Sequence, residues 1–227
     1  SEGPDKYTLG SGYDWVTYRD GRFGVYADML NNGAVAGPLP QSLAGTAQVF
    51  AFTEGLSGSS HGDILRGDHE DALTLPGNGA QGSVLSQIDL ISGLRALIGT
   101  AAMPGADGIA GNADDEFGSG NIILGGEASD IIEGRSGDDI IDGDRWLNVR
   151  ISVRDADDPN LELASFDSMQ ALVPLMMNGT YNPGQLVIVR EILSGTDHYD
   201  TAVYSGVSTD YSVVVDGNSV TVTDLVA

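Results

Sequence analysis

Acidic residues recur every nine places in the segment 116–144, and this spacing could build a cation site. Divided into nines, the segment reads EFGSGNIIL, GGEASDIIE and GRSGDDIID, followed by GD. The sixth place holds Asn121, Asp130 or Asp139, and the eighth place always holds isoleucine. Carboxylate and carbonyl oxygens are the ligands that Ca²⁺ takes in proteins. The spacing therefore predicts several calcium ions bound between successive units.

Nine residues suffice for one tight turn and one short strand, so two units would complete one lap of a flattened coil. Glycines permit the left-handed backbone of such turns, and the eighth-place isoleucines would point inward and stack. Residues 18 apart share an edge, so Asn121 and Asp139 are expected to flank one calcium ion, with Asp130 on the other edge. The neutral amide of Asn121 predicts weaker binding there. Turn residues included among the candidate ligands are Gly126, Ala128 and Gly137.

The same register returns outside the central segment, in laps near 3–17, 49–68 and 195–203. In the first, Asp5 and Asp14 are nine apart; in the second, Glu54 and Asp63 are nine apart, followed by inward-facing Leu56 and Leu65. The sixth-place acids that we expect to be further calcium ligands are Asp14, Asp63 and Asp200.

Two longer segments separate the first laps. Residues 18–48 are predicted to be a loop containing one strand, because FGVYADM alternates apolar and polar residues. In the insert 69–115, apolar residues between 85 and 98 have helical spacing interrupted by Gly93, which predicts an amphipathic helix packed on the coil. The insert ends in a glycine loop whose clustered acids favour either a cation site or a solvated loop. These acids are Asp107, Asp114 and Asp115.

A third insert, 145–194, begins with a strictly alternating stretch, 146–154, typical of a half-buried strand. Arg150 and Arg154 lie on it and could recognise an anionic ligand or offset nearby carboxylates. A short helix is predicted to end at Asn178-Gly179, and a second to begin at Asn182 with a capping box. Residues 204–227 are predicted to form a hairpin over the open end of the coil.

The net charge restricts the kinds of molecule that this chain can bind. The 227 residues include 33 acidic and 10 basic ones, giving −23. This excess argues against binding to nucleic acid or to an anionic membrane surface, since both require basic residues. No run of about 18 apolar residues predicts membrane insertion. With no cysteine, packing and bound metal must provide the stability that disulfides give many secreted proteins. A halophile-type acidic surface is the alternative explanation, but the acids fall in register.

The tandem units of 116–144 follow the pattern G-G-x-G-x-D-x-U-x, in which U is aliphatic. The chain thereby resembles the RTX (repeats-in-toxin, haemolysin-type calcium-binding) group of secreted bacterial proteins. This resemblance implies a mainly β fold in one domain spanning 1–227, namely a parallel β-roll with helical inserts. It also implies secretion by the type I route and folding on calcium after export. The chain opens and closes mid-pattern, which suggests a module with neighbouring domains in a longer protein.

Three further stretches carry a narrower resemblance: EGLSGSSHGDILRGD, the segment from GNIIL to RISVR, and YNPGQLVIVREILSGTDHYDTAVYSG. They are similar to the interrupted RTX region of large secreted bacterial proteins that also carry animal-type haem-peroxidase domains. No histidine here has the pattern of a haem ligand. No serine–histidine–acid or paired-carboxylate constellation is evident either, so we expect a structural calcium module rather than an enzyme. Self-cleavage at the acid-labile Asp158-Pro159 bond is the enzymatic alternative. The alternatives are an adhesin that binds a cell-surface or glycan ligand through its inserts, and an accessory region of a peroxidase-type protein.

Overall fold

The computed structural model describes residues 6–9, 12–31, 49–51, 53–69, 84–118 and 120–226. The fold is mainly β, with parallel sheets and few helices, as the sequence predicted. Asp5 and the part of the predicted loop at 32–48 lie outside the described residues.

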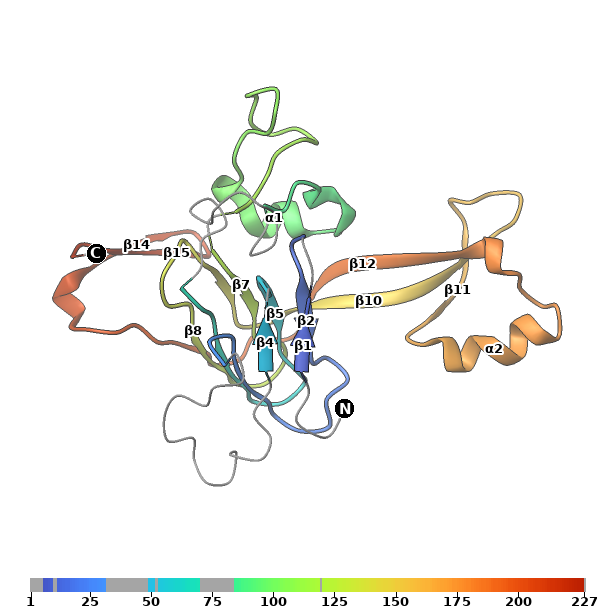
Figure 1. The fold of residues 1–227 in the computed structure, drawn as a ribbon, viewed down its shortest axis with the longest axis horizontal. Helices are drawn as coiled ribbons and strands as arrows, with labels where there is room; N and C mark the ends of the chain where they lie inside the picture. The colour runs from blue at the N-terminus through green and yellow to red at the C-terminus, as the bar shows by residue number, and fades with distance from the viewer. Residues whose placement is uncertain are drawn as a thin grey trace.

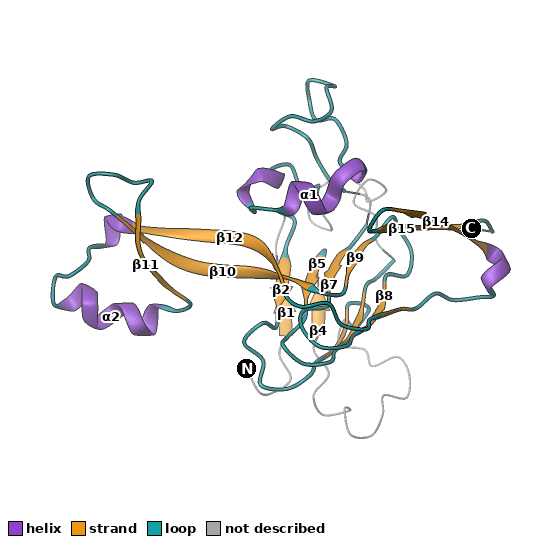
Figure 2. Cartoon of the chain, turned by 180° about the vertical axis from the view of Figure 1, so that it is seen from behind, coloured by secondary structure: helices purple, strands orange, loops and turns teal. Residues whose placement is uncertain are grey.

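Two four-stranded parallel sheets form the body of the molecule (Figures 1 and 2). The first sheet contains, in spatial order, β2 (Trp15–Thr17), β5 (Gly55–Ser57), β7 (Ile122–Leu124) and β9 (Ile140–Asp142). The second contains β3 (Tyr26–Asp28), β6 (Ile64–Arg66), β8 (Ile131–Glu133) and β13 (Thr201–Ala202). A separate parallel pair joins β1 (Lys6–Thr8) to β4 (Val49–Ala51). Because β2 precedes β3, β5 precedes β6 and β7 precedes β8, the chain passes alternately between the two sheets.

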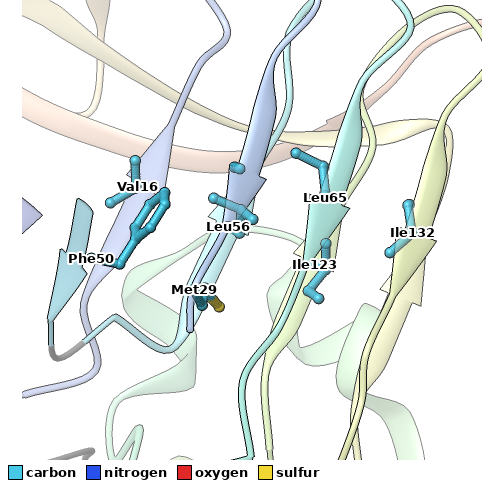
Figure 3. Close-up of a cluster of buried hydrophobic side chains, with 8 residues drawn as sticks. Val16, Met29, Phe50, Leu56, Leu65, Ile123 and Ile132 are labelled. Carbon is cyan, nitrogen blue, oxygen red and sulfur yellow. The ribbon is translucent and has the colours of Figure 1, made fainter. Parts of the chain in front are cut away.

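The middle residue of each strand fills the space between the sheets. Leu56 and Ile123 enter this core from the first sheet, and Leu65 and Ile132 from the second (Figure 3). All four are at most 1% exposed, and burying each stabilises the fold by about 1.5–3 kcal/mol. The predicted inward positions are therefore confirmed.

One segment predicted to leave the sheets in fact joins them. The strand predicted within 18–48 is confirmed as β3, but its place in the second sheet was not predicted: it pairs in parallel with β6 through Tyr26 and Ile64. Val25 occupies the place where the other units carry an acid or amide, so the register was not visible in the sequence. Its backbone N–H nevertheless donates to Asp63 Oδ1 at 2.6 Å, as the pattern requires.

The apolar stretch 85–98 packs on the opposite face of the first sheet, but as two short helical turns with a third following directly after it. These are the 3-10 turn Ile88–Leu90, α1 (Leu94–Ile98) and the 3-10 turn Gly99–Ala101. Gly93, with a φ of 83°, separates the first turn from α1. Ile88 and Leu94 pack in one cluster with Ile122 of β7. The predicted packing is thus confirmed, although the helix is divided.

The insert 145–194 is a projecting β arm with one α-helix (Figure 1). It contains β10 (Arg145–Arg154), β11 (Glu162–Phe166), α2 (Met169–Met177), the 3-10 turn Pro183–Gln185 and β12 (Leu186–Ser194). The predicted strand and the helix ending at Asn178 are confirmed. The helix predicted from Asn182 is wrong: its capping box forms, but only one 3-10 turn follows. The β-branched run 187–189 then favours a strand, which pairs antiparallel with β10.

The C-terminal hairpin forms as predicted. After the 3-10 turn Ser208–Asp210, β14 (Tyr211–Asp216) pairs antiparallel with β15 (Ser219–Asp224). It does not cover the sheets with its apolar residues, because Val213, Val215 and Val220 remain 58–69% exposed. None of the helices in the described part of the chain has the length and apolar character that crossing a bilayer requires.

Candidate metal centre

A ladder of aspartates lines the edge where the chain enters the second sheet. Asp63, Asp130 and Asp200 directly precede β6, β8 and β13. Asp130 Oδ1 accepts the backbone N–H of Asp63 at 2.7 Å, and Asp200 Oδ1 accepts that of Asp130 at 2.8 Å. Three predicted ligands that lie far apart in the sequence are therefore stacked on one edge, which we call the Asp63–Asp130–Asp200 ladder.

Glycine at the first place of each turn makes room for these carboxylates. A Cβ added at Gly125 would overlap both Asp130 Oδ2 and the carbonyl oxygen of Gly143. A Cβ at Gly143 would likewise overlap Asp200 Oδ2. The carboxylates of Asp130 and Asp200 thus lie over the Cα atoms of Gly125 and Gly143, which carry no Cβ. The carbonyl oxygen of Gly143 lies beside Asp130.

Asp130 is the least satisfied member of the ladder. It is 1% exposed, and its Oδ2 atom is buried with no hydrogen-bond partner among the described residues. Burial, together with the charges of Asp63, Asp200 and Asp144, raises the pKa of Asp130 to about 7, although the hydrogen bond from the Asp63 N–H lowers it. A buried carboxylate oxygen without a donor costs free energy, and a cation ligated there would remove that cost.

Asp63 has a different environment within the same ladder. Its Oδ2 accepts the N–H of Ser59 at 2.6 Å, and its Oδ1 accepts the Ser59 hydroxyl at 3.0 Å as well as the N–H of Val25. Burial raises the pKa of Asp63, while the hydrogen bonds from Ser59 and Val25 lower it. Protein donors therefore satisfy both oxygens of this carboxylate.

The opposite edge carries a second row, as the 18-residue spacing predicted. Asp139 Oδ1 accepts the N–H of Asn121 at 2.8 Å, and Asn121 Oδ1 accepts that of Asp68 at 2.9 Å. A Cβ added at Gly134 would overlap Asp139 Oδ2. Burial raises the pKa of Asp139 to about 7, with further contributions from the charges of Asp68 and Asp138. The backbone N–H of Asp14 lies on this side too, donating to Glu54 Oε2 at 2.7 Å.

The turns adopt the left-handed backbone that the glycine pattern requires. Gly126, Ala128 and Gly137 have φ values of 114°, 72° and 101°. Arg135 is also left-handed at 81°, which the sequence did not indicate. Its guanidinium Nη1 donates to both Asp28 Oδ1 and the carbonyl oxygen of Gly67 at 2.6 Å. A protein cation therefore lies beside a turn carbonyl on this part of the second sheet.

The acidic loop of the second insert is closed largely by its own hydrogen bonds. Asp114 Oδ2 accepts the N–H of Asp107 at 3.1 Å. Asp115 is 1% exposed and pairs with Arg95 at 2.7 Å. The three predicted ligands share the loop, but a guanidinium already neutralises one of them.

The acidic side chains on these edges could hold a calcium ion only if backbone carbonyl oxygens also act as ligands. Within the described ranges, no three His, Cys, Asp or Glu side chains form a group that could hold a metal ion by themselves. Calcium takes six to eight oxygen ligands, commonly including backbone carbonyls. The carbonyl of Gly143 beside Asp130 is of this kind, so the Asp63–Asp130–Asp200 ladder offers both carboxylate and carbonyl oxygens.

Sequence reasoning missed three contributors to these edges: Ser59, Asp68 and Asp144. The two aspartates had a sequence signal, because each follows the first-place glycine of a unit as a Gly-Asp pair, 67–68 and 143–144. Ser59 had none, since its role depends on the contact with Asp63. Comparisons of the chain with protein-family models, with curated proteins and with solved structures find no match.

Proposed function

We propose that this chain is a calcium-binding structural module that folds as a parallel β-roll when its carboxylate edges bind calcium. The observation that carries the proposal is Asp130 Oδ2, a buried carboxylate oxygen without a donor among the described residues, beside a backbone carbonyl. The alternation of the strands between two parallel sheets supports the roll.

Calcium would act on the free energy of folding. The chain carries −23, and stacking the ladder brings Asp63, Asp130 and Asp200 together, so repulsion opposes closure of the metal-free form. A cation that binds only the closed form stabilises it by mass action. Asp130 and Asp139 would be the principal carboxylate ligands, one on each edge, with Asn121 a weaker partner of Asp139.

The resemblance to RTX proteins extends this proposal to the whole protein. A module that folds only with calcium stays open in a calcium-poor cytosol and closes outside the cell. We therefore propose a secreted parent protein with further domains, in which this chain has a structural rather than an enzymatic role.

The test is to measure folding against calcium in the metal-free protein, by far-UV circular dichroism and by hydrogen exchange of β7, β8 and β9. Calcium should produce a cooperative gain of β signal and protect these strands. Asp130→Asn should weaken calcium binding at least about tenfold, because a charged ligand becomes neutral. The control is Asp216→Asn, an exposed acid on the hairpin, which should leave binding unchanged. Full protection of all three strands without metal would contradict the proposal.

The adhesin alternative through Arg150 and Arg154 receives no specific support. Arg150 donates to Glu162 at 2.7 Å and to Glu191 at 2.8 Å. Its guanidinium therefore neutralises carboxylates of the arm itself. The sequence interpretation that these arginines offset acids agrees with the pairing of Arg150, whereas Arg154 donates to the carbonyl oxygen of Asn160 at 3.3 Å.

A further inference from the structure

The distal part of the β arm carries no charge over a long stretch of sequence. The run 168–189 contains no Asp, Glu, Lys, Arg or His, although 19% of the chain's residues are charged. It comprises α2, the 3-10 turn Pro183–Gln185 and the first residues of β12. Figures 1 and 2 show this part of the chain projecting away from the parallel sheets, whose edges carry the carboxylates. An uncharged end is therefore held apart from the strongly acidic body.

The solvent side of α2 is apolar. Met169, Val173 and Met177 lie four residues apart, so they share one side of the helix, and they are 43%, 48% and 84% exposed. Leu172, on the adjoining side, packs in one cluster with Ile151 of β10. A helix on the surface of a soluble protein normally places charged and polar residues towards solvent. The exposed side of α2 instead has the composition of a buried one.

The strand β12 extends this apolar surface onto the sheet of the arm. Ile188 is in register with Ile151, and residues directly opposite each other lie on the same face of a sheet. Because Ile151 packs with Leu172 of α2, Ile188 lies on the face that carries the helix, and it is 49% exposed. We call Met169, Val173, Met177 and Ile188 the α2 patch. Exposed apolar residues gathered in this way, rather than scattered singly, mark a contact surface.

We propose that the α2 patch is the contact through which two copies of this chain form a dimer. The distribution of charge identifies the occupant. Residues 145–194 contain six acidic and four basic residues, so they account for only −2 of the net charge of −23. Contact between the ends of two arms leaves the two acidic bodies at opposite ends of the dimer, where they repel each other least. The same patch on both copies forms the contact, which therefore closes at two copies.

The charges disfavour a contact through the hairpin and a lipid surface as the partner. The hairpin also exposes valines, but Asp210, Asp216 and Asp224 lie on or beside it, and no Lys or Arg follows Arg190 in the sequence. Two copies would therefore repel each other there. Helices that lie on a membrane surface are rich in Lys and Arg on their polar side, and α2 contains neither. A second copy of the chain at the α2 patch is thus the partner that the charges favour.

The test uses the full chain with saturating calcium, so that its outcome does not depend on whether calcium drives folding. Sedimentation equilibrium up to about 1 mM protein should show a reversible monomer–dimer equilibrium. We expect a Kd on the order of 100 μM, because four apolar side chains per copy are far fewer than the roughly 20–30 residues a side of a standard interface. Raising the salt concentration from about 0.1 M to about 1 M should tighten the dimer, since salt screens the repulsion between the bodies.

Two variants locate the contact. Met177→Glu should raise the Kd at least about tenfold, because it brings two like charges together across the contact. Ile109→Glu makes the same change at a residue of the 104–116 loop that is 62% exposed, and it should leave the Kd unchanged. In the unmodified chain, the methyl NMR signal of Met177 should shift with protein concentration, whereas that of Met29, which is buried in the core between the sheets, should not.

Three outcomes would overturn the proposal. One is a chain that stays monomeric at about 1 mM in high salt. Another is a dimer that Met177→Glu leaves intact and that Val213→Glu, on the hairpin, dissociates. The third is a monomeric chain that binds neutral phosphatidylcholine vesicles through Met177, which would identify a lipid surface as the partner. Because Met177 is 84% exposed, its substitution is not expected to unfold the chain, and an unchanged circular dichroism spectrum checks this.

Discussion

The turns 58–63 and 125–130 lie on the same edge and differ in how they satisfy their aspartate. Each begins with a glycine over which the carboxylate packs, and each has aspartate in the sixth place. The second place holds Ser59 in one turn and Gly126 in the other. Ser59 donates both its N–H and its hydroxyl to Asp63, whereas Asp130 Oδ2 has no donor among the described residues.

The difference in Oδ2 lies in the second-place backbone N–H, which donates to Asp63 Oδ2 in one turn and does not reach Asp130 Oδ2 in the other. The Ser59 hydroxyl adds a hydrogen bond to Asp63 Oδ1 that Gly126 cannot make. The first turn therefore satisfies its carboxylate with protein donors, whereas in the second an oxygen remains for an external cation. Proposed calcium sites should therefore be ranked by the donors around each carboxylate and not by the motif alone.

The largest effect is expected from filling the space under the unsatisfied carboxylate. In Gly125→Ala, the new Cβ would overlap Asp130 Oδ2 and the backbone of Gly143. Because backbone cannot move aside cheaply, we expect a loss of about 3 kcal/mol or more and of the calcium-induced β signal. Calcium-dependent urea unfolding measures both. Gly184→Ala is the control, because the new Cβ would meet only the exposed Asn182 side chain, at 3.1 Å, and no backbone atom. Equal stabilities of the two variants would contradict the comparison.

The pH dependence of the metal-free protein gives the next largest effect. Burial raises the pKa of Asp130 and of Asp139 from 3.8 to about 7, so the folded state binds protons more tightly than the unfolded state. The resulting stability is present at low pH and is lost as the pH rises from about 4 through about 7. Metal-free protein should therefore melt at a higher temperature at pH 5 than at pH 7.5. Calcium affinity should rise over the same interval, because calcium must displace these protons. If the melting temperature of the metal-free protein instead increases with pH, the predicted direction of the pH dependence is wrong.

The smallest effect tests the satisfied turn. Ser59→Ala removes the hydroxyl that donates to Asp63 Oδ1 and accepts the backbone N–H of His61 but retains the backbone N–H of residue 59. We expect the metal-free protein to lose about 2 kcal/mol, at about 1 kcal/mol for each of the two hydrogen bonds. Urea unfolding measures the loss, with Ser60→Ala, whose hydroxyl contacts only the exposed His61 ring, as the reference. If both variants unfold at the same urea concentration, the Ser59 hydroxyl does not satisfy Asp63 in solution.

The nine-residue period predicted those structural features that depend only on a residue's position within the repeat. The inward aliphatics Leu56 and Ile132, and the edge shared by Asn121 and Asp139, followed from counting along the chain. The period could not predict contacts between distant segments. Arg95 pairs with Asp115 and Arg135 with Asp28 because folding brings them together. The strand β12 was mistaken for a helix because its capping box is local, whereas its pairing with β10 is not.

The antiparallel pairing of β10 with β12 has a consequence for how the last strand reaches its sheet. The whole arm separates β9 from β13 along the chain, and closing so long a loop costs conformational entropy. Pairing of Arg145 with Ser194 brings the two ends of the arm together, and the N–H of Gly195 donates to the carbonyl of Asp144 at 3.0 Å. Once β10 and β12 have paired, only a short effective loop separates β9 from β13. The paired arm thus shortens the effective chain separation that the last strand pairing must close. This favours a folding order in which the arm forms before β13 pairs with β8.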